Sequence, residues 1–515
     1  MAGQPTNLDP IEVKPGQPII LEPGEIELRR ALGPVQLIAL GIGAIIGTGI
    51  FVITGHAAAS YAGPGVVISF VIAGVGCLFA GLCYAEYASM IPVAGSAYTY
   101  TYSTLGKFLA WLIGWNLILE YLAAASVVAV GWSGYFTKLM GQIGVHLPEA
   151  LVNAPIKVKT LAAAAGGCSV TPGGSLAMNF VPTGDTANFI AMAIILLITG
   201  LLVVGIRASA QFTVAMVVVK VTVVVLVILF GLPLIKYANL HPFIPPNTCA
   251  WGHFGWSGVL RATGVIFFAY IGFDAVSVAA QEAKNPQRDM PIGILGSLLI
   301  CTVLYILMAI TMTGLASYTK LNVSYPVFVA IQSAGPQLAW LGVAVNIAVV
   351  AGLAAVMLVL ILGQSRIFYA MSRDGLVPPF FSKVHPRFRT PYAGTILTGA
   401  FASVLAAVVP LDILGELVSI GTLAAFVIVC FGIMVLRRTH PHAKRPFRTP
   451  FVWIVAPLGI LTCGAMMAWL PWDTWVRLAI WTAIGLAIYF LYSVRHAKPP
   501  RWQLVEEVPA APAAE

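Results

Sequence analysis

The sequence predicts an all-α membrane protein with twelve transmembrane helices, and this prediction depends on composition and on the length of the apolar segments. Of the 515 residues, 59% are hydrophobic and only 9% are charged, whereas soluble domains carry about 25% charged residues. Mean hydropathy is +0.91. So few charges could not cover the surface of soluble domains. A soluble enzyme, a nucleic-acid-binding protein and a disordered regulator are therefore excluded.

Twelve segments are long and apolar enough for a helix to cross a bilayer, which takes about 20 residues. Runs such as residues 214–231 are continuously apolar and do not alternate, which argues against a transmembrane β-barrel. The predicted segments are 32–55, 65–91, 106–137, 186–206, 210–234, 257–282, 290–316, 336–368, 392–410, 413–437, 450–469 and 473–495.

Basic residues orient the predicted helices. Most of the 28 Lys and Arg residues fall in the tails and in the loops on the side of the N-terminus. Because cytoplasmic loops carry an excess of Lys and Arg, both termini are expected in the cytoplasm, and the chain in the cell membrane. Residues 1–30 contain no apolar stretch typical of a cleaved signal peptide.

Four glycines, Gly41, Gly43, Gly47 and Gly49, lie close together in the first predicted span. Their spacing differs from a dinucleotide-binding fingerprint, and no strand precedes them. Close helix packing through small residues is one explanation, but glycines two positions apart face different directions. We favour a broken helix, whose freed amides around Thr48 and Gly49 point at an anion and whose second half adds a positive dipole end.

The sixth predicted span contains a second interrupted segment, residues 264–274, which includes Gly272. Glycine-interrupted spans at corresponding positions of two halves are typical of transporters built from inverted repeats. The predicted organisation is an N-terminal cytoplasmic tail, two five-helix repeats, two further helices and a C-terminal cytoplasmic tail. The corresponding ranges are 1–30, 31–240, 241–440, 441–496 and 497–515.

Ionisable residues deep in the spans are the strongest candidates for chemistry, because a charge facing lipid costs a few kcal/mol. They are Glu86, Glu120, Lys220 and Asp274. Glu86 precedes a polar, Pro- and Gly-containing stretch, which favours a structural role near an inner gate. For Lys220 two interpretations remain. A desolvated lysine can gain and lose a proton during turnover, or it forms a permanent ion pair with a carboxylate of another helix.

Seven cysteines occur without CxxC spacing, and the eight histidines lie in predicted loops or near span ends. No metal site and no cofactor is therefore expected. Cys168 and Cys249 fall in neighbouring outer loops on the oxidising face, where a disulfide between them is one hypothesis and two unrelated thiols the other.

Several of these segments, in this order, resemble the amino acid–polyamine–organocation superfamily, and within it the cationic amino acid transporter family. The matching features are residues 41–51, Lys220, residues 267–274 and two inner-loop strings, 282–291 and 366–375. The likeness extends from about Arg29 to Arg495. It implies the LeuT-like fold, in which first and sixth helices are broken and two helices follow the five-plus-five inverted repeat.

The resemblance also implies how a substrate binds. Backbone groups of Ile45, Thr48 and Gly49 would hold the α-carboxylate of an amino acid and help to hold its amine. Carbonyl oxygens of Phe268 and Ile271 would complete the amine site.

Further roles follow from the same resemblance. A lysine at the position of Lys220 takes the place of the sodium ion of sodium-coupled relatives, which argues for proton coupling. Glu120 and Asp274 match acidic residues of the third and sixth helices and are expected to take part. Met357, on the eighth helix, is expected to line the side-chain pocket.

The predicted function is proton-coupled import of an L-amino acid by alternating access, and not an enzymatic reaction. Apolar Met357 and the nearby phenylalanines favour a small neutral substrate, whereas Glu120 keeps a cationic one open. An exchanger without net proton flow is the alternative. A membrane amino acid sensor ranks lower, because no large output domain is predicted. The expected partners are the amino acid, protons and the lipid bilayer, and no nucleic acid.

Overall fold

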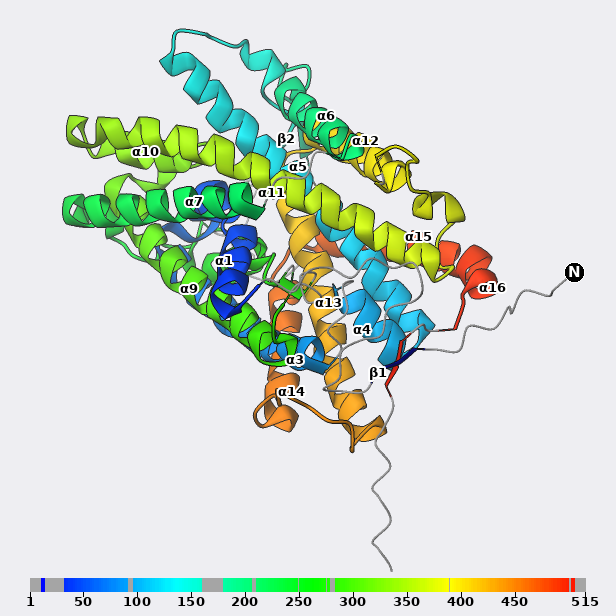
Figure 1. The fold of residues 1–515 in the computed structure, drawn as a ribbon. Helices are drawn as coiled ribbons and strands as arrows, with labels where there is room; N and C mark the ends of the chain where they lie inside the picture. The colour runs from blue at the N-terminus through cyan, green and yellow to red at the C-terminus, as the bar shows by residue number, and fades with distance from the viewer. Residues whose placement is uncertain are drawn as a thin grey trace, which may run out of the picture.

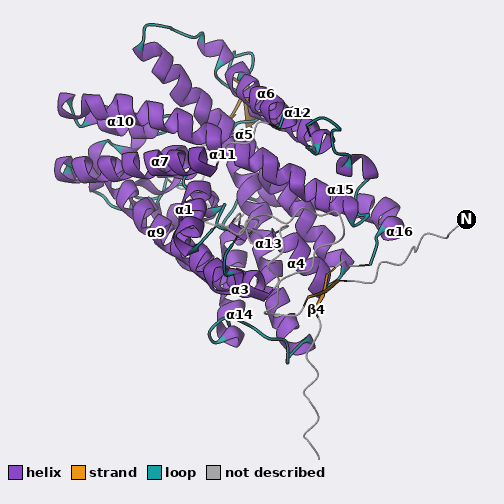
Figure 2. Ribbon diagram, viewed as in Figure 1, coloured by secondary structure: helices purple, strands orange, loops and turns teal. Residues whose placement is uncertain are grey.

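The computed structural model describes residues 11–13, 32–90, 96–159, 179–205, 210–248, 250–274, 276–277, 283–388, 390–499 and 502–504. In this part of the chain, long helices pack side by side and strands are few and short (Figures 1 and 2). The predicted all-α class is therefore confirmed. Cys168 and Cys249, the predicted disulfide partners, lie outside the described residues.

Most of the described helices fall in the segments that the sequence predicts. Each of the twelve predicted segments contains a described α-helix over at least part of its length. The α-helices are α1 (Pro34–Ile45), α2 (Thr54–Ala57), α3 (Val66–Met90), α4 (Ser96–Thr104), α5 (Lys107–Gln142), α6 (Phe189–Val203), α7 (Ala210–Gly231), α8 (Gly255–Ile266), α9 (Pro286–Leu315), α10 (Pro326–Ser333), α11 (Ala339–Arg373), α12 (Tyr392–Val408), α13 (Leu411–Thr439), α14 (Val452–Ala468), α15 (Trp472–Ile488) and α16 (Val494–His496).

Short strands pair at two places. β1 (Ile11–Val13) and β4 (Trp502–Leu504) form a parallel pair that joins the two tails of the chain. β2 (Ile156–Lys159) and β3 (Asn179–Pro182) form an antiparallel pair within the long loop after α5.

The surfaces of the long helices are suited to lipid. Seven helical stretches of the described residues are long and apolar enough to cross a membrane, and four shorter apolar helices accompany them. Large apolar side chains are exposed on these helices, for example Leu299 at 63% and Leu491 at 73%. In water such surfaces would favour association, whereas in a bilayer they face lipid tails. The protein is therefore a multi-pass membrane protein.

Two short helices, α4 and α10, fall outside the predicted segments. α4 is rich in Ser, Thr and Tyr, so it lacks the apolar stretch of a span, and it packs against α5 and β4. α10 begins at Pro326, and proline is favoured in the first turn of a helix because its missing N–H is not needed there. α5 also continues beyond the predicted end at residue 137, to Gln142.

The centre of the bundle is built on α5. This helix packs along α11 and α13, while α1 and α3 pack along α9 (Figure 1). The breaks of the first and sixth predicted spans lie in this centre.

Candidate functional site

The first predicted span is interrupted, as the sequence predicts. α1 ends at Ile45, and Ile46 has extended backbone angles, φ −72° and ψ 97°. Helical structure resumes as the π-helix η1 (Gly49–Ile53), which continues into α2. Because the first amides of a helix have no carbonyl of a preceding turn to bond, the amides around Thr48 and Gly49 can bind an anion.

The glycines of this span have different roles. A Cβ atom on Gly41 would lie 2.4 Å from Oγ of Ser297, and one on Gly43 would lie 2.3 Å from Cγ2 of Val217. Both glycines lie inside α1 and permit close packing against α9 and α7, so the prediction that they mark the break is wrong. Gly47 lies at the break, where a Cβ would meet no atom closer than 3.7 Å.

The sixth predicted span is interrupted too. α8 ends at Ile266 and is followed by the 3₁₀ helix η7 (Phe267–Tyr270) and by Ile271, whose ψ is 138°. Gly272 has φ +113°, a conformation that glycine adopts without steric cost. A Cβ on Gly272 would lie 2.8 Å from the backbone C and O of Ala44. The two breaks are therefore in direct contact.

A second contact joins the breaks near Gly49, where a Cβ would lie 2.4 Å from Cα of Ala269. Beside it, the hydroxyl of Tyr305 on α9 lies 2.8 Å from the carbonyl oxygens of both Ile45 and Ala269. A hydroxyl has one hydrogen and donates to one of these carbonyls at a time. The other carbonyl keeps its capacity to accept a hydrogen bond. Sequence reasoning missed Tyr305, because nothing in its apolar span distinguishes it from a packing residue.

Lys220 on α7 binds the end of the first half-helix. Its Nζ donates hydrogen bonds of 2.7 Å to the carbonyl oxygen of Gly43 and of 2.9 Å to that of Ile46. The side chain is only 2% exposed and passes over Gly352 of α11, where a Cβ would lie 2.5 Å from its Cδ. Its hydrogen-bond partners are carbonyl oxygens, and no carboxylate pairs with it among the described residues, so the ion-pair interpretation is not supported.

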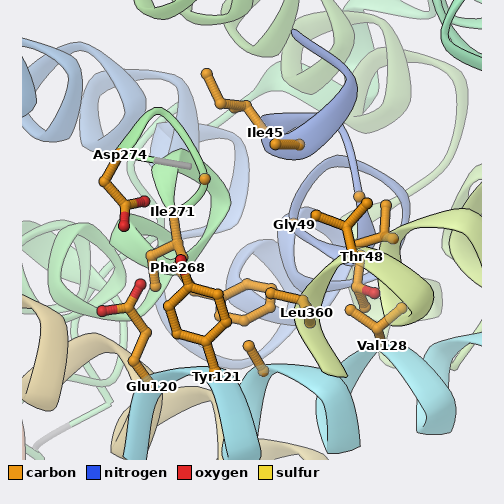
Figure 3. Close-up of a pocket in the computed structure, with 16 residues that line it drawn as sticks. Ile45, Thr48, Gly49, Glu120, Tyr121, Val128, Phe268, Ile271, Asp274 and Leu360 are labelled. Atoms are coloured by element: carbon orange, nitrogen blue, oxygen red, sulfur yellow. The ribbon is translucent and has the colours of Figure 1, made fainter. Parts of the chain in front are cut away.

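A pocket lies between the two breaks, α5 and α11 (Figure 3). The predicted site residues that line it are Ile45, Gly47, Thr48, Gly49, Glu120, Phe268, Ile271, Gly272 and Asp274. The remaining lining residues are Ala44, Tyr121, Ala124, Val128, Val356, Val359 and Leu360. Apart from Met357, the residues expected to bind substrate thus come together at one place.

Two of the residues predicted to bind substrate or protons do not line this pocket. Met357 is fully buried in α11, and its neighbour Val356 lines the pocket instead. Successive residues of a helix point about 100° apart, so only one of the two can face the pocket, and the prediction for Met357 is corrected accordingly. Lys220 contacts the first break itself and is not among the lining residues.

The pocket has two chemically different ends. The carboxyl groups of Glu120 and Asp274 face each other on one side, and Val128 and Leu360 lie on the other (Figure 3). Apart from these carboxyls, Thr48 and Tyr121, the lining side chains are apolar.

Ion pairs that sequence reasoning missed lie at the start of α13. Nε2 of His56 on α2 is 2.9 Å from Oδ1 of Asp412. Glu416, one turn further along α13, lies 3.4 Å from both Arg261 of α8 and Arg477 of α15. These pairs attach the helical halves α2 and α8, which adjoin the two breaks, to the same helix.

A pocket between two discontinuous helices in a bundle of apolar helices is the architecture of a membrane transport protein. Residues 32–493 match the sequence profile of the family described as amino acid permease. The chain belongs to the amino acid permease family, which confirms the predicted superfamily.

Similar proteins include bacterial and plant transporters. The chain is 46% identical over 476 residues to the branched-chain amino acid permease BcaP of Bacillus subtilis (strain 168), which covers 92% of this chain and 95% of that protein. It is 43% identical over 484 residues to the methylthioribose transporter of the same strain, and the match covers 94% of this chain and 98% of that protein. It is 36% identical over 423 residues to the vacuolar cationic amino acid transporter 4 of Arabidopsis thaliana, and the match covers 82% of this chain and 66% of that protein. The relatives are named as permeases and transporters, so the prediction of a protein that is not an enzyme is confirmed.

Proposed function

We propose that this protein imports a neutral amino acid with an aliphatic side chain, together with a proton, by alternating access. The observation that carries the proposal is the pocket in which two helix breaks offer backbone groups beside a wall of apolar side chains. In such a site, backbone amides and carbonyls of the protein recognise the α-carboxylate and α-ammonium groups that all amino acids share. The apolar side chains of the pocket recognise the side chain of the substrate, which differs between amino acids.

Backbone groups supply the recognition of the α-amino acid moiety. Amides around Thr48 and Gly49, at the start of η1, suit the α-carboxylate because the helix dipole adds partial positive charge there. Carbonyl oxygens of Ile45, Phe268 and Ile271 suit the α-ammonium group, which needs acceptors. Because the hydroxyl of Tyr305 donates to the carbonyl of either Ile45 or Ala269 at a time, the other of these two carbonyls keeps spare accepting capacity.

The side chain of the substrate then points at the α5 and α11 wall, formed by Ala124, Val128, Val356, Val359 and Leu360. Burial of a charged side chain against such a wall would be strongly unfavourable, whereas an aliphatic one gains the hydrophobic term. The name of the branched-chain amino acid permease BcaP agrees with this substrate class.

Proton coupling is assigned to Lys220, with Glu120 and Asp274 as further proton-binding groups. When protonated, the lysine ammonium donates to the carbonyls of Gly43 and Ile46 and so holds the end of α1. Loss of the proton removes its charge from these charge-assisted hydrogen bonds and weakens them. Protonation thereby favours one position of the first half-helix.

We further propose the LeuT-like arrangement, with twelve crossings, repeats at 31–240 and 241–440, and both termini in the cytoplasm. Support comes from the two breaks, which lie in the first and sixth predicted spans and contact each other through Gly272 and Ala44. The excess of basic residues on the side of the termini supports the orientation.

A panel of radiolabelled substrates in proteoliposomes, with and without an imposed pH gradient, tests this function. We expect leucine, valine and alanine to accumulate only when the lumen is more alkaline than the outside. Uptake by counterflow with no response to the gradient would establish an exchanger instead. Saturable binding without flux would establish a sensor. Accumulation of methylthioribose with no amino acid uptake would overturn the proposed substrate.

A glycine pair at the first break provides an internal test of the binding geometry. Gly49→Ala should reduce uptake by about 100-fold, the effect of displacing a preorganised group by about 1 Å, because its Cβ would collide with the backbone of Ala269. Gly47→Ala is the matched control, since its Cβ meets only ordinary contacts with Val356. Initial uptake rates, normalised to folded protein by size-exclusion chromatography, measure the difference. Equal rates for the two variants would reject the assignment of this break as the binding site.

A further inference from the structure

The acidic end of the pocket raises a question about selectivity. Glu120 and Asp274 are 1% and 2% exposed, and their carboxyl groups face each other (Figure 3). Oε2 of Glu120 has no hydrogen-bond partner among the described residues. A buried carboxyl pair of this kind is a strong acceptor for an ammonium or guanidinium group. An otherwise apolar pocket would thus take lysine or arginine if their side chains could reach this pair.

Tyr121 stands where such a side chain would have to pass. Its ring lies between the two carboxyl groups and Leu360, and its side chain is beside Asp274 in the pocket (Figure 3). The ring also fills the space over Gly363 of α11, where a Cβ would lie 2.6 Å from its Cε1. The ring of Tyr121 is therefore packed between the acidic pair and α11.

The position of Tyr121 on α5 explains why it separates the two ends. Tyr121, Ala124 and Val128 are spaced three and four residues apart, so they form one stripe of the helix facing the pocket. Glu120 lies about 100° from Tyr121 around the helix axis, on the other side of Ala124, and also lines the pocket. The small Ala124 and the aliphatic Val128 leave room for a substrate, whereas the tyrosine ring closes the route from that room to Glu120.

We propose that Tyr121 determines specificity by screening the Glu120–Asp274 pair from the substrate side chain, so that the site takes neutral and rejects cationic amino acids. This inference rests on the proposed transport of neutral amino acids. It accounts for acidic groups in a pocket whose substrate wall is apolar. A cationic side chain in the unchanged pocket loses its hydration and gains no counter-charge, whereas without the ring it reaches one.

Tyr121→Ala tests the proposal directly, with L-lysine as the probe. In proteoliposomes, the inhibition constant of lysine against uptake of radiolabelled leucine should fall by about 10- to 100-fold, the value of one or two hydrogen bonds to a charged group. Radiolabelled lysine should also become a substrate. Tyr121→Leu serves if the alanine variant does not fold. Leucine keeps the apolar packing but is shorter than the tyrosine ring, so the inhibition constant of lysine should fall in this variant too.

Two controls separate screening from general loosening of the pocket. Tyr121→Phe keeps the ring and loses only the hydroxyl, so it should still exclude lysine. The double variant Tyr121→Ala with Glu120→Gln should lose most of the gain, because one counter-charge is gone. Leucine uptake by Tyr121→Ala without improved inhibition by lysine would overturn the proposal, and so would equal gain in the double variant.

The outcome is distinguishable from failure of the proposed function. If the unchanged protein transports no neutral amino acid, the proposed function is wrong. Binding of lysine to purified Tyr121→Ala, measured by its effect on the thermal unfolding midpoint and compared with Tyr121→Phe, then still decides whether the ring screens the acidic pair.

Discussion

Replacing Lys220 by alanine should abolish accumulation of substrate driven by a pH gradient. The ammonium group makes hydrogen bonds of 2.7 and 2.9 Å to the carbonyl oxygens of Gly43 and Ile46, and no other titratable side chain hydrogen-bonds these oxygens in the described part of the chain. Without it, protonation no longer biases the first half-helix. A ligand or proton shifts a two-state equilibrium only through a difference in binding between the states. Accumulation ratios in proteoliposomes with an alkaline lumen measure the effect.

Counterflow exchange by the same variant shows whether the pocket survives. We expect Lys220→Ala to exchange substrate across the membrane while the accumulation ratio falls to about one, because the amides and carbonyls of the breaks remain. Lys220→Arg retains a permanent positive charge that cannot be lost in proteins, so it should also fail to couple to protons. A Lys220→Ala variant that concentrates substrate as the unchanged protein does would show that the switch is elsewhere.

Glycine spacing in the first span was sufficient to predict its break but not the role of each glycine. Gly47 and Gly49 lie at the break, as expected for positions where the chain leaves the helix. Gly41 and Gly43 instead accommodate Ser297 and Val217, and these neighbours come from helices more than 150 residues away in sequence. Local spacing carries no information on which helix will pack against a given face.

The sequence predicted the backbone positions and the two carboxyl groups of the pocket, Glu120 and Asp274, but missed two tyrosines beside them. The backbone sites follow from the two interrupted segments. Tyr305, which bridges Ile45 and Ala269, and Tyr121, which stands beside Asp274, are tyrosines in apolar spans. Met357 was placed at the pocket, but the rotation of α11 presents Val356. Such rotation depends on packing between helices, so one sequence does not determine it.

Replacing Glu86 by glutamine should produce the largest loss of stability. Its side chain is fully buried and forms a bidentate ion pair with Arg437. Nε of Arg437 lies 2.8 Å from Oε1 of Glu86, and Nη2 lies 2.8 Å from Oε2. It also lies 3.2 Å from Nε of Arg445 and accepts a 2.8 Å hydrogen bond from the amide of Thr449. Breaking a buried ion pair by removing one partner costs about 3–5 kcal/mol, because the other charge stays buried without compensation. Here two arginines lose their carboxylate. Thermal unfolding of the purified protein in detergent measures the loss.

An exposed ion pair provides the control for this prediction. Asp473 pairs with Arg477 one turn along α15, and both side chains are partly exposed, at 23% and 20%. Such pairs contribute about 0–1 kcal/mol, so Asp473→Asn should shift the unfolding midpoint far less than Glu86→Gln. Because Glu86 links α3, α13 and the segment before α14 and does not line the pocket, the folded fraction of Glu86→Gln should bind leucine with unchanged affinity. Equal midpoints for the two variants would reject the structural role of Glu86, and weakened leucine binding by stable Glu86→Gln would assign it to transport instead.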